Sequence, residues 1–323
     1  MTFSKAFLNA FPPNTRLLSF AIIYFILYFS GALFFYKERI FLDGAYYFFH
    51  VIQAENFRVE HQRFILIPSQ LLLLAAVKLH LPMEWLMVFN SLNPGLYLLI
   101  LFILCVGALR DVAAGWALML VGVCGIYFLY FCPMYEVWYG AALLIFFSSL
   151  INKRFYNTTW QLLGVAIASV TLLFSYPLMI VGLIFILLYH FLEIRKVPMK
   201  LAAILGIVCI FWLVWKILFL SEYETGKIGY PLSQITKIAK ENFGSVTNII
   251  TLITFLIRIY TEEIIAFLIV TTMLIFRRKY ELALLVGFFI GGFILLVNLT
   301  QNTPWHHSNY FERLYLLLVP MCL

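Results

Sequence analysis

The densest group of polar and ionisable residues lies between positions 41 and 64, in FLDGAYYFFHVIQAENFRVEHQRF. Asp43 directly follows a long apolar run, and a carboxylate held at a membrane surface close to cations suits general-base chemistry on a lipid-borne substrate. His61 and Arg63 suit a phosphate headgroup, because a guanidinium can contact phosphate through two hydrogen bonds. An ordinary interfacial loop with solvated charges is the alternative, since short motifs carry little specificity.

An aromatic stretch follows the carboxylate, and we expect residues 45–57 to form a helix. Tyr46, Tyr47, Phe49 and His50 are predicted to supply one aromatic face of it. We expect Tyr46, Tyr47 and His50 to line the groove that receives the substrate. Tyrosines of an interfacial aromatic belt would give the same pattern.

A second carboxylate, Glu136, is the sole acid of the short segment CPMYEVWYG between two apolar runs. An unpaired carboxylate between apolar helices is costly. The sequence therefore predicts a partner for Glu136, which is a cation, a metal ion or the substrate. A solvated loop acid is the alternative.

A third polar group occurs in NTPWHHSNYFERLYLLLVP. His306, His307 and Arg313 gather there before a last apolar run, and Trp305 and Tyr310 suit the membrane interface. Adjacent histidines do not share a helix face, and the spacing supplies no set of three or four zinc ligands. We expect these cationic residues to bind a phosphate, with incidental residues of an aromatic belt as the alternative.

The composition shows which elements must hold these residues. Hydrophobic residues make up 64% of the 323, charged residues 11%, and the mean hydropathy is +0.97. Soluble domains are nearer half apolar and a quarter charged. The net charge of +7 comes from basic residues scattered at the ends of apolar runs, which argues against a nucleic-acid partner. The sequence predicts an integral membrane protein whose partner is the lipid bilayer.

The apolar runs predict an all-α, polytopic transmembrane bundle of about ten spans in a single domain, 1–323. A last span begins near Leu314. Two further apolar stretches, 64–79 and 246–260, are predicted to be re-entrant or interface-lying helices. The clear spans are 17–36, 88–109, 113–131, 137–151, 160–175, 178–192, 201–220, 262–276 and 281–299.

Basic residues set the orientation of such a bundle, because they stay on the cytoplasmic side. Arg110 and the basic groups at 153–154, 195–200 and 277–279 fall on one side only if neither ambiguous stretch spans. This predicts a multi-pass protein of a bacterial inner or plasma membrane with a cytoplasmic N-terminus.

Two long loops, 37–87 and 221–261, then lie outside, and each is expected to carry interfacial helices. The same topology places 12 of the 15 acids outside. Acids gathered on one face can form a site there, so the site is predicted to be extracytoplasmic.

The order of these features resembles the GT-C polytopic glycosyltransferases, particularly the branch related to protein O-mannosyltransferases and lipid A aminoarabinose transferases. That branch has an acidic motif with tyrosine just after the first span, where Asp43 lies here. Lys78 and Glu84 match a stretch before the second span, and Glu136 matches an acid between spans three and four. FERLYLLLVP resembles a late motif that opens a span, through Arg313. The likeness covers residues 17–155 and 300–320.

The resemblance implies transfer of a sugar from a polyprenyl-phosphate donor to a lipid, glycan or protein acceptor, by one inverting displacement on the extracytoplasmic face. Asp43 would be the base, and Glu136 would orient the acceptor or a cation. A divalent cation is a possible cofactor, although Gly44 stands where the branch has its second acid. The donor phosphate would be bound by His61, Arg63, His306, His307 and Arg313.

Two other classes stay open. An O-antigen polymerase- or ligase-like enzyme also uses polyprenyl-linked sugars, but its site rests on Arg and His of a large outer loop. The loop 221–261 offers lysines and an arginine but no histidine. A flippase or other transporter of lipid-linked sugars would need ionisable residues deep within the spans, and these are scarce.

Overall fold

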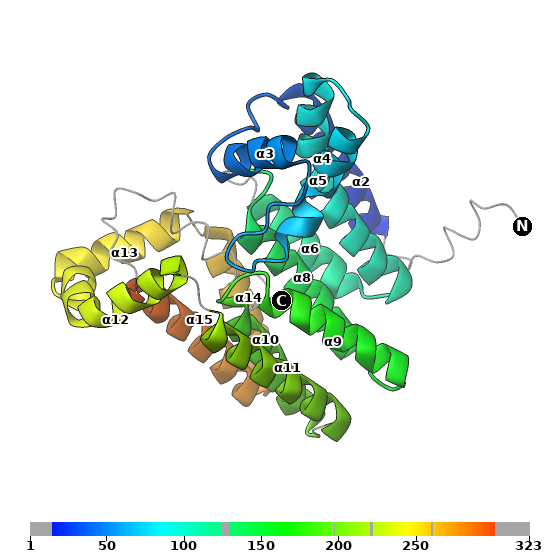
Figure 1. Cartoon of the computed structure of the whole chain (residues 1–323). Coiled ribbons are helices and arrows are strands. Elements are labelled where there is room, and N and C mark those ends of the chain that lie inside the picture. Colours follow the sequence, from blue (N-terminus) through cyan, green and yellow to red (C-terminus); the bar gives the residue numbers. More distant parts are fainter. Residues whose placement is uncertain (1–14, 125–129, 197, 220–221, 260, 301–323) are drawn as a thin grey trace, which may run out of the picture. The chain divides into compact units, whose positions relative to one another are not determined.

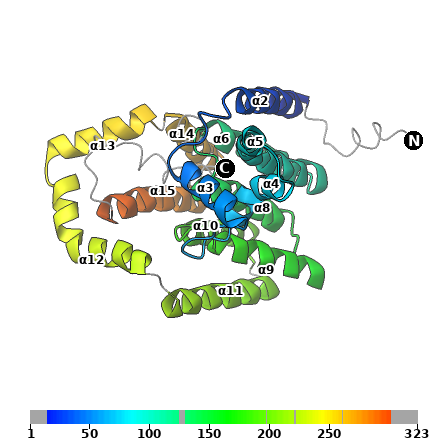
Figure 2. The ribbon, with the colours of Figure 1, turned by 45° about the horizontal axis from the view of Figure 1, so that its top comes forward.

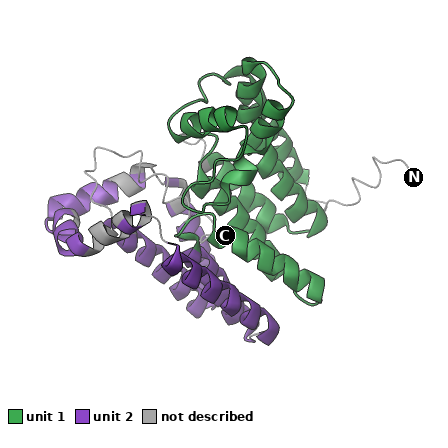
Figure 3. Ribbon diagram, in the orientation of Figure 1, with its two compact units in different colours: residues 1–179 green, residues 180–323 purple. Residues whose placement is uncertain are grey.

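The chain is all-helical, as predicted. The computed structural model describes residues 15–124, 130–196, 198–219, 222–259 and 261–300. Within these ranges it contains thirteen α-helices, one π-helical turn and no strand (Figure 1). The chain divides into two compact units, residues 1–179 and 180–323, which are described separately here (Figure 3).

Three helices are long and apolar enough to cross a membrane. They are α2 (Thr15–Phe34), α5 (Met83–Phe102) with its π-helical continuation η1 (Ile103–Ala108), and α11 (Met199–Leu218). At 1.5 Å per residue, the 20 residues of α2 or α11 reach about 30 Å, which is the thickness of the hydrocarbon core. The described chain thus has helices of a membrane protein. The count of about ten spans stays a prediction, since seven other apolar helices have only 10–17 residues.

The first unit is built around α8 (Glu136–Asn152), where every residue from Glu136 to Ile145 is buried. Four neighbours surround it: α4 (Leu66–Lys78), α5, α6 (Val112–Cys124) and α9 (Thr159–Leu173). With 13 residues, α4 is about 20 Å long, which is shorter than the hydrocarbon core, and it packs along α5 (Figure 2).

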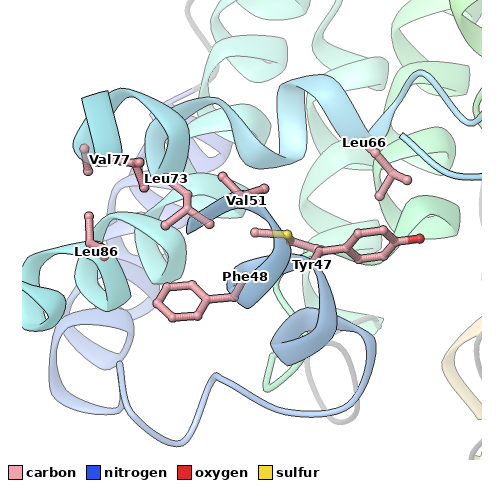
Figure 4. Packing of buried hydrophobic residues seen from close by; sticks show 9 residues of the cluster. Tyr47, Phe48, Val51, Leu66, Leu73, Val77 and Leu86 are labelled. Atoms are coloured by element: carbon pink, nitrogen blue, oxygen red, sulfur yellow. The ribbon is translucent and has the colours of Figure 1, made fainter. Parts of the chain in front are cut away.

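The predicted helix after Asp43 exists as α3 (Asp43–Ala54), beginning two residues earlier and ending three earlier than expected. Tyr47, Phe48 and Val51 are buried against α4 and α5, and Figure 4 shows the Tyr47 hydroxyl directed away from this cluster. The prediction of one aromatic face was wrong. Adjacent helical residues point about 100° apart, so Tyr47 turns inward while Tyr46 remains exposed.

Arginines end four of the helices in a conformation that glycine usually supplies. Arg110, Arg154, Arg195 and Arg278 have φ between 54° and 56° and lie at the C-terminal ends of η1, α8, α10 and α14. A left-handed non-glycine residue costs roughly 1–2 kcal/mol. A cation at a helix C-terminus offsets about 0.3–1 kcal/mol of that cost. These arginines belong to the basic groups that predict the cytoplasmic side.

The second unit contains more helix than the sequence predicts. The segment 221–261 was expected to be a loop with one apolar helix, but it holds α12 and α13. The glycines and the proline of α12 disfavour a helix, and for this reason α12 was not predicted from the sequence. The helices of this unit are α10 (Met179–Ile194), α11, α12 (Glu222–Phe243), α13 (Val246–Ile259), α14 (Thr261–Phe276) and α15 (Tyr280–Thr300).

A buried amide fastens α4 to α5. The Asn93 amide nitrogen donates to the carbonyl oxygens of Pro68 and Ser69 at 2.9 and 2.8 Å, and its oxygen accepts from the Leu72 N–H. We expect Asn93→Ala to destabilise the protein by about 2–3 kcal/mol, because the lost hydrogen bonds leave buried groups unsatisfied. Thermal denaturation in detergent measures the effect.

Asn90 gives the matched control, one turn earlier on the same helix. It is equally buried, but its amide has no hydrogen-bond partner among the described residues. Asn90→Ala should therefore change stability by less than about 1 kcal/mol. Equal losses in the two variants would show that Asn93 does not fasten α4.

Candidate functional site

An ion pair joins the loop before α4 to the start of α8. Arg63 Nη1 lies 3.0 Å from Glu136 Oε1, and the two side chains are only 14% and 6% exposed. Glu136 was expected in a loop but is the first residue of α8, where a negative charge is favoured by the helix dipole. The predicted requirement for a partner is thus satisfied by a cation from a segment 73 residues away.

A tyrosine contacts each member of the ion pair. The Arg63 guanidinium lies over the ring of Tyr176 at 5.1 Å, and the Tyr47 hydroxyl approaches Glu136 Oε1 at 3.4 Å. Burial lowers the pKa of the Arg63 guanidinium, but Glu136, Tyr176 and Tyr47 together outweigh burial, so that the pKa is raised. Arg63 Nε has no hydrogen-bond partner within the described chain. The group is therefore a fixed cation with unused donor capacity, since a guanidinium carries five N–H donors.

The backbone directly before Arg63 forms a left-handed turn. His61 and Gln62 both adopt left-handed conformations, with φ of 50° and 59°. Such residues store strain and are typical of functional sites. On one side of this turn, Gln70 exchanges two hydrogen bonds of 2.8 Å with the backbone of Arg58. On the other, the Phe64 N–H donates to the Phe174 carbonyl, so the turn is fixed at both ends.

Asp43 is the first residue of α3 and is exposed. It lies one helical turn before Tyr47, and residues four apart share a helix face. Burial raises the pKa of Tyr47 well above its ordinary value, and the charges of Glu136, Glu60 and Asp43 add to this effect. The two carboxylates predicted from the sequence therefore both act on one phenol, which stays protonated and can donate a hydrogen bond.

Close packing explains why a glycine follows Asp43. Gly44 is buried, and a Cβ added to it would lie 3.3 Å from Cδ of Pro133, in the segment that leads into α8. The carboxylate side chain that the GT-C branch carries at this place would therefore meet Pro133. This contact also brings the start of α3 close to the start of α8.

A second polar cluster covers the exposed side of α3. Glu60 accepts hydrogen bonds from the Tyr46 hydroxyl and from Arg58, and His50 contacts the Tyr46 ring at 4.4 Å. Partial burial raises the pKa of Glu60, but the hydrogen bonds from Tyr46 and Arg58 lower it, and the pKa lies below its ordinary value. Predicted groove residues Tyr46 and His50 thus lie together, while Glu60 is a site residue that sequence reasoning missed.

No protein-family model, curated protein or solved structure matches the chain. The likeness to the GT-C enzymes therefore rests on the residues quoted from the sequence. His306, His307 and Arg313, which were predicted to bind the phosphate, lie outside the described residues.

Sequence reasoning also missed a buried arginine after the first span. Arg39 is fully buried, its Nη2 donates to the Tyr28 hydroxyl at 2.9 Å, and its guanidinium lies 4.1 Å from the centroid of the Tyr130 ring. No ion pair to Arg39 occurs in the described part of the chain. Its contact with Tyr130 was not detectable from the sequence, because it joins segments about 90 residues apart. In the same described part, no three His, Cys, Asp or Glu side chains gather as metal ligands.

The ion pair should show strong energetic coupling. Arg63→Met or Glu136→Met alone leaves a buried charge unpaired, so each should destabilise the protein by about 3–5 kcal/mol. The double variant should be more stable than the two single losses combined predict, with a coupling energy of about 1–3 kcal/mol. Chemical or thermal denaturation of the four proteins in detergent gives this value.

The pair Lys78–Glu55 is the control, because both side chains are more than half exposed at an N–O distance of 3.3 Å. Its coupling energy should stay below about 1 kcal/mol. If the buried pair couples no more strongly than this exposed one, Arg63 is not anchored by Glu136.

Proposed function

We propose that the chain is a membrane glycosyltransferase. It moves a sugar from a polyprenyl-phosphate donor to a hydroxyl acceptor on the extracytoplasmic face, with inversion at the anomeric carbon. The observation that carries this proposal is the Arg63–Glu136 pair beside α3, with Asp43 one turn from Tyr47. These residues supply a carboxylate, a phenol donor and a cation.

The roles follow from the environment of each group. Asp43 is exposed, whereas Glu136 is buried and committed to Arg63. Asp43 is therefore the carboxylate that accepts the proton of the acceptor hydroxyl. The hydroxyl oxygen bonds to the anomeric carbon, and the bond from that carbon to the phosphate oxygen breaks with its electron pair. Arg63 stabilises the negative charge that develops on the polyprenyl phosphate.

Apolar surface beside the site suits a lipid-linked donor. Phe41, Leu42 and Phe49 are exposed to about half of their area, and they flank Asp43 along the chain. Large exposed apolar side chains next to polar groups are typical of a site at a membrane interface. His61, His306, His307 and Arg313 are proposed to add cationic contacts to the phosphate.

The proposed topology has a cytoplasmic N-terminus and about ten spans in a bacterial inner or plasma membrane. Both α4 and α13, with 13 and 14 residues, would lie on the outer side without spanning, because only then do the basic groups at the helix ends all fall on the cytoplasmic side. Lipid, glycan and protein acceptors all fit this arrangement, and a divalent cation beside the phosphate remains compatible with it.

Loss of the base should abolish transfer without unfolding the protein. Asparagine is accepted at a helix N-terminus, so Asp43→Asn should preserve α3. We expect a decrease of about 10²–10⁴ in rate, which is the usual contribution of a general base. The assay measures release of polyprenyl phosphate from a panel of polyprenyl-phosphate sugars in membranes that contain the full-length protein.

Glu55, which ends the same helix and pairs with Lys78 on the surface, provides the matched control. Glu55→Gln should retain normal transfer. Normal activity of a folded Asp43→Asn variant would remove Asp43 from the proposed role. Failure of the wild-type protein to consume any donor of the panel would count against glycosyl transfer itself.

The topology is tested independently of activity. Cysteines placed at His80 and at Ser245, one at a time, should react with a membrane-impermeant reagent from outside intact cells. Both positions lie in connections that the proposal places on the extracytoplasmic side. Labelling of either position only after permeabilisation would contradict an outer-face site.

A further inference from the structure

A charged pocket of about 200 Å³ lies in the second unit, between the end of α10 and the turn from α14 to α15. Two ion pairs join these segments, Arg195 to Glu281 at 2.8 Å and Lys279 to Glu193 at 3.0 Å. The pocket is smaller than the roughly 300 Å³ of sites for drug-sized ligands, so it suits a single small headgroup.

The pocket has more cations than its acids can neutralise. Three of the residues that line it are basic, Arg195, Arg278 and Lys279, and two are acidic, Glu193 and Glu281. Both acids are occupied by the two ion pairs. Arg278 lines the pocket, is exposed, and has no ion-pair partner among the described residues. The surplus charge favours an anionic ligand.

Exposed apolar side chains border the same turn. Phe276, immediately before the basic residues, is 84% exposed, and Leu284, just after the turn, is 74% exposed. Exposed apolar residues of this kind at the end of an apolar helix indicate contact with acyl chains. A charged pocket bordered by such residues matches the boundary between headgroups and acyl chains of a bilayer.

We propose that this pocket binds the phosphate headgroup of an anionic phospholipid, with Arg278 as the principal contact. The α14 turn presents Arg278 for this contact, because the left-handed backbone at φ 56° is fixed by the hydrogen bonds from Arg278 N to Ile275 O and from Lys279 N to Leu274 O. The lipid is favoured over free phosphate because the border is apolar. The proposal requires membrane embedding and is independent of sugar transfer.

Native mass spectrometry of the full-length protein in detergent tests the proposal, with phosphatidylglycerol titrated against phosphatidylcholine. Arg278→Asn removes the charge but suits the left-handed backbone, so folding should be preserved. It should weaken phosphatidylglycerol binding about fivefold, the usual effect of one basic residue near an anionic lipid surface. Arg278→Lys keeps the charge and should stay within about twofold of the wild type.

Arg154 is the matched control, since it is an exposed arginine with φ 55° at the end of α8 and follows a lysine. Arg154→Asn removes the same charge from a similar backbone and should leave binding unchanged. Equal weakening in Arg154→Asn and Arg278→Asn would overturn the site in favour of overall charge. Equal binding of the two lipids, or displacement of phosphatidylglycerol by excess inorganic phosphate, would also overturn it.

Discussion

The buried ion pair of Arg63 and Glu136 is the interaction on which the arrangement of the first unit depends. It joins the turn before α4 to the first residue of α8, the central helix of that unit. Two charges removed from water are costly unless they are paired and hydrogen-bonded. The left-handed turn at His61 and Gln62 directly precedes Arg63, which pairs with Glu136, and the Phe64 N–H that follows is bonded to the Phe174 carbonyl.

The ion pair gives the two carboxylates, Glu136 and Asp43, different environments. Glu136 is buried and bound to a cation, so its charge is already compensated, whereas Asp43 lies at the exposed start of α3. Two acids with different environments are the usual basis for different roles in one site. Tyr47 connects them, since its ring packs in the core of α3, α4 and α5 and its hydroxyl approaches Glu136.

The elements of the fold could be predicted where periodicity and length are clear. The apolar runs predicted the positions of α2, α5, α8 and α11. Charge patterning identified the arginines that end four helices, although their left-handed conformations could not be foreseen. The helix α12 was missed, because local propensity disfavours it and its packing against α15 is a long-range contact.

The site was predictable as a set of residue types but not as a set of pairs. Asp43, Arg63 and Glu136 were identified from their positions at the ends of apolar runs. Their connection was not, because the partner of Glu136 lies 73 residues earlier and the turn that delivers it contains no glycine. Tyr176 and Arg39 were not identified, since the contacts of Tyr176 with Arg63 and of Arg39 with Tyr130 join segments far apart in the chain.

A structure with a non-hydrolysable polyprenyl-phosphonate sugar tests the central claim most directly. We predict that the phosphonate accepts hydrogen bonds from Arg63 while Arg63 remains paired with Glu136. We also predict that the anomeric carbon faces Asp43, with space between them for an acceptor hydroxyl. A phosphonate bound away from Arg63, or an anomeric carbon on the far side of α3 from Asp43, would contradict the central claim.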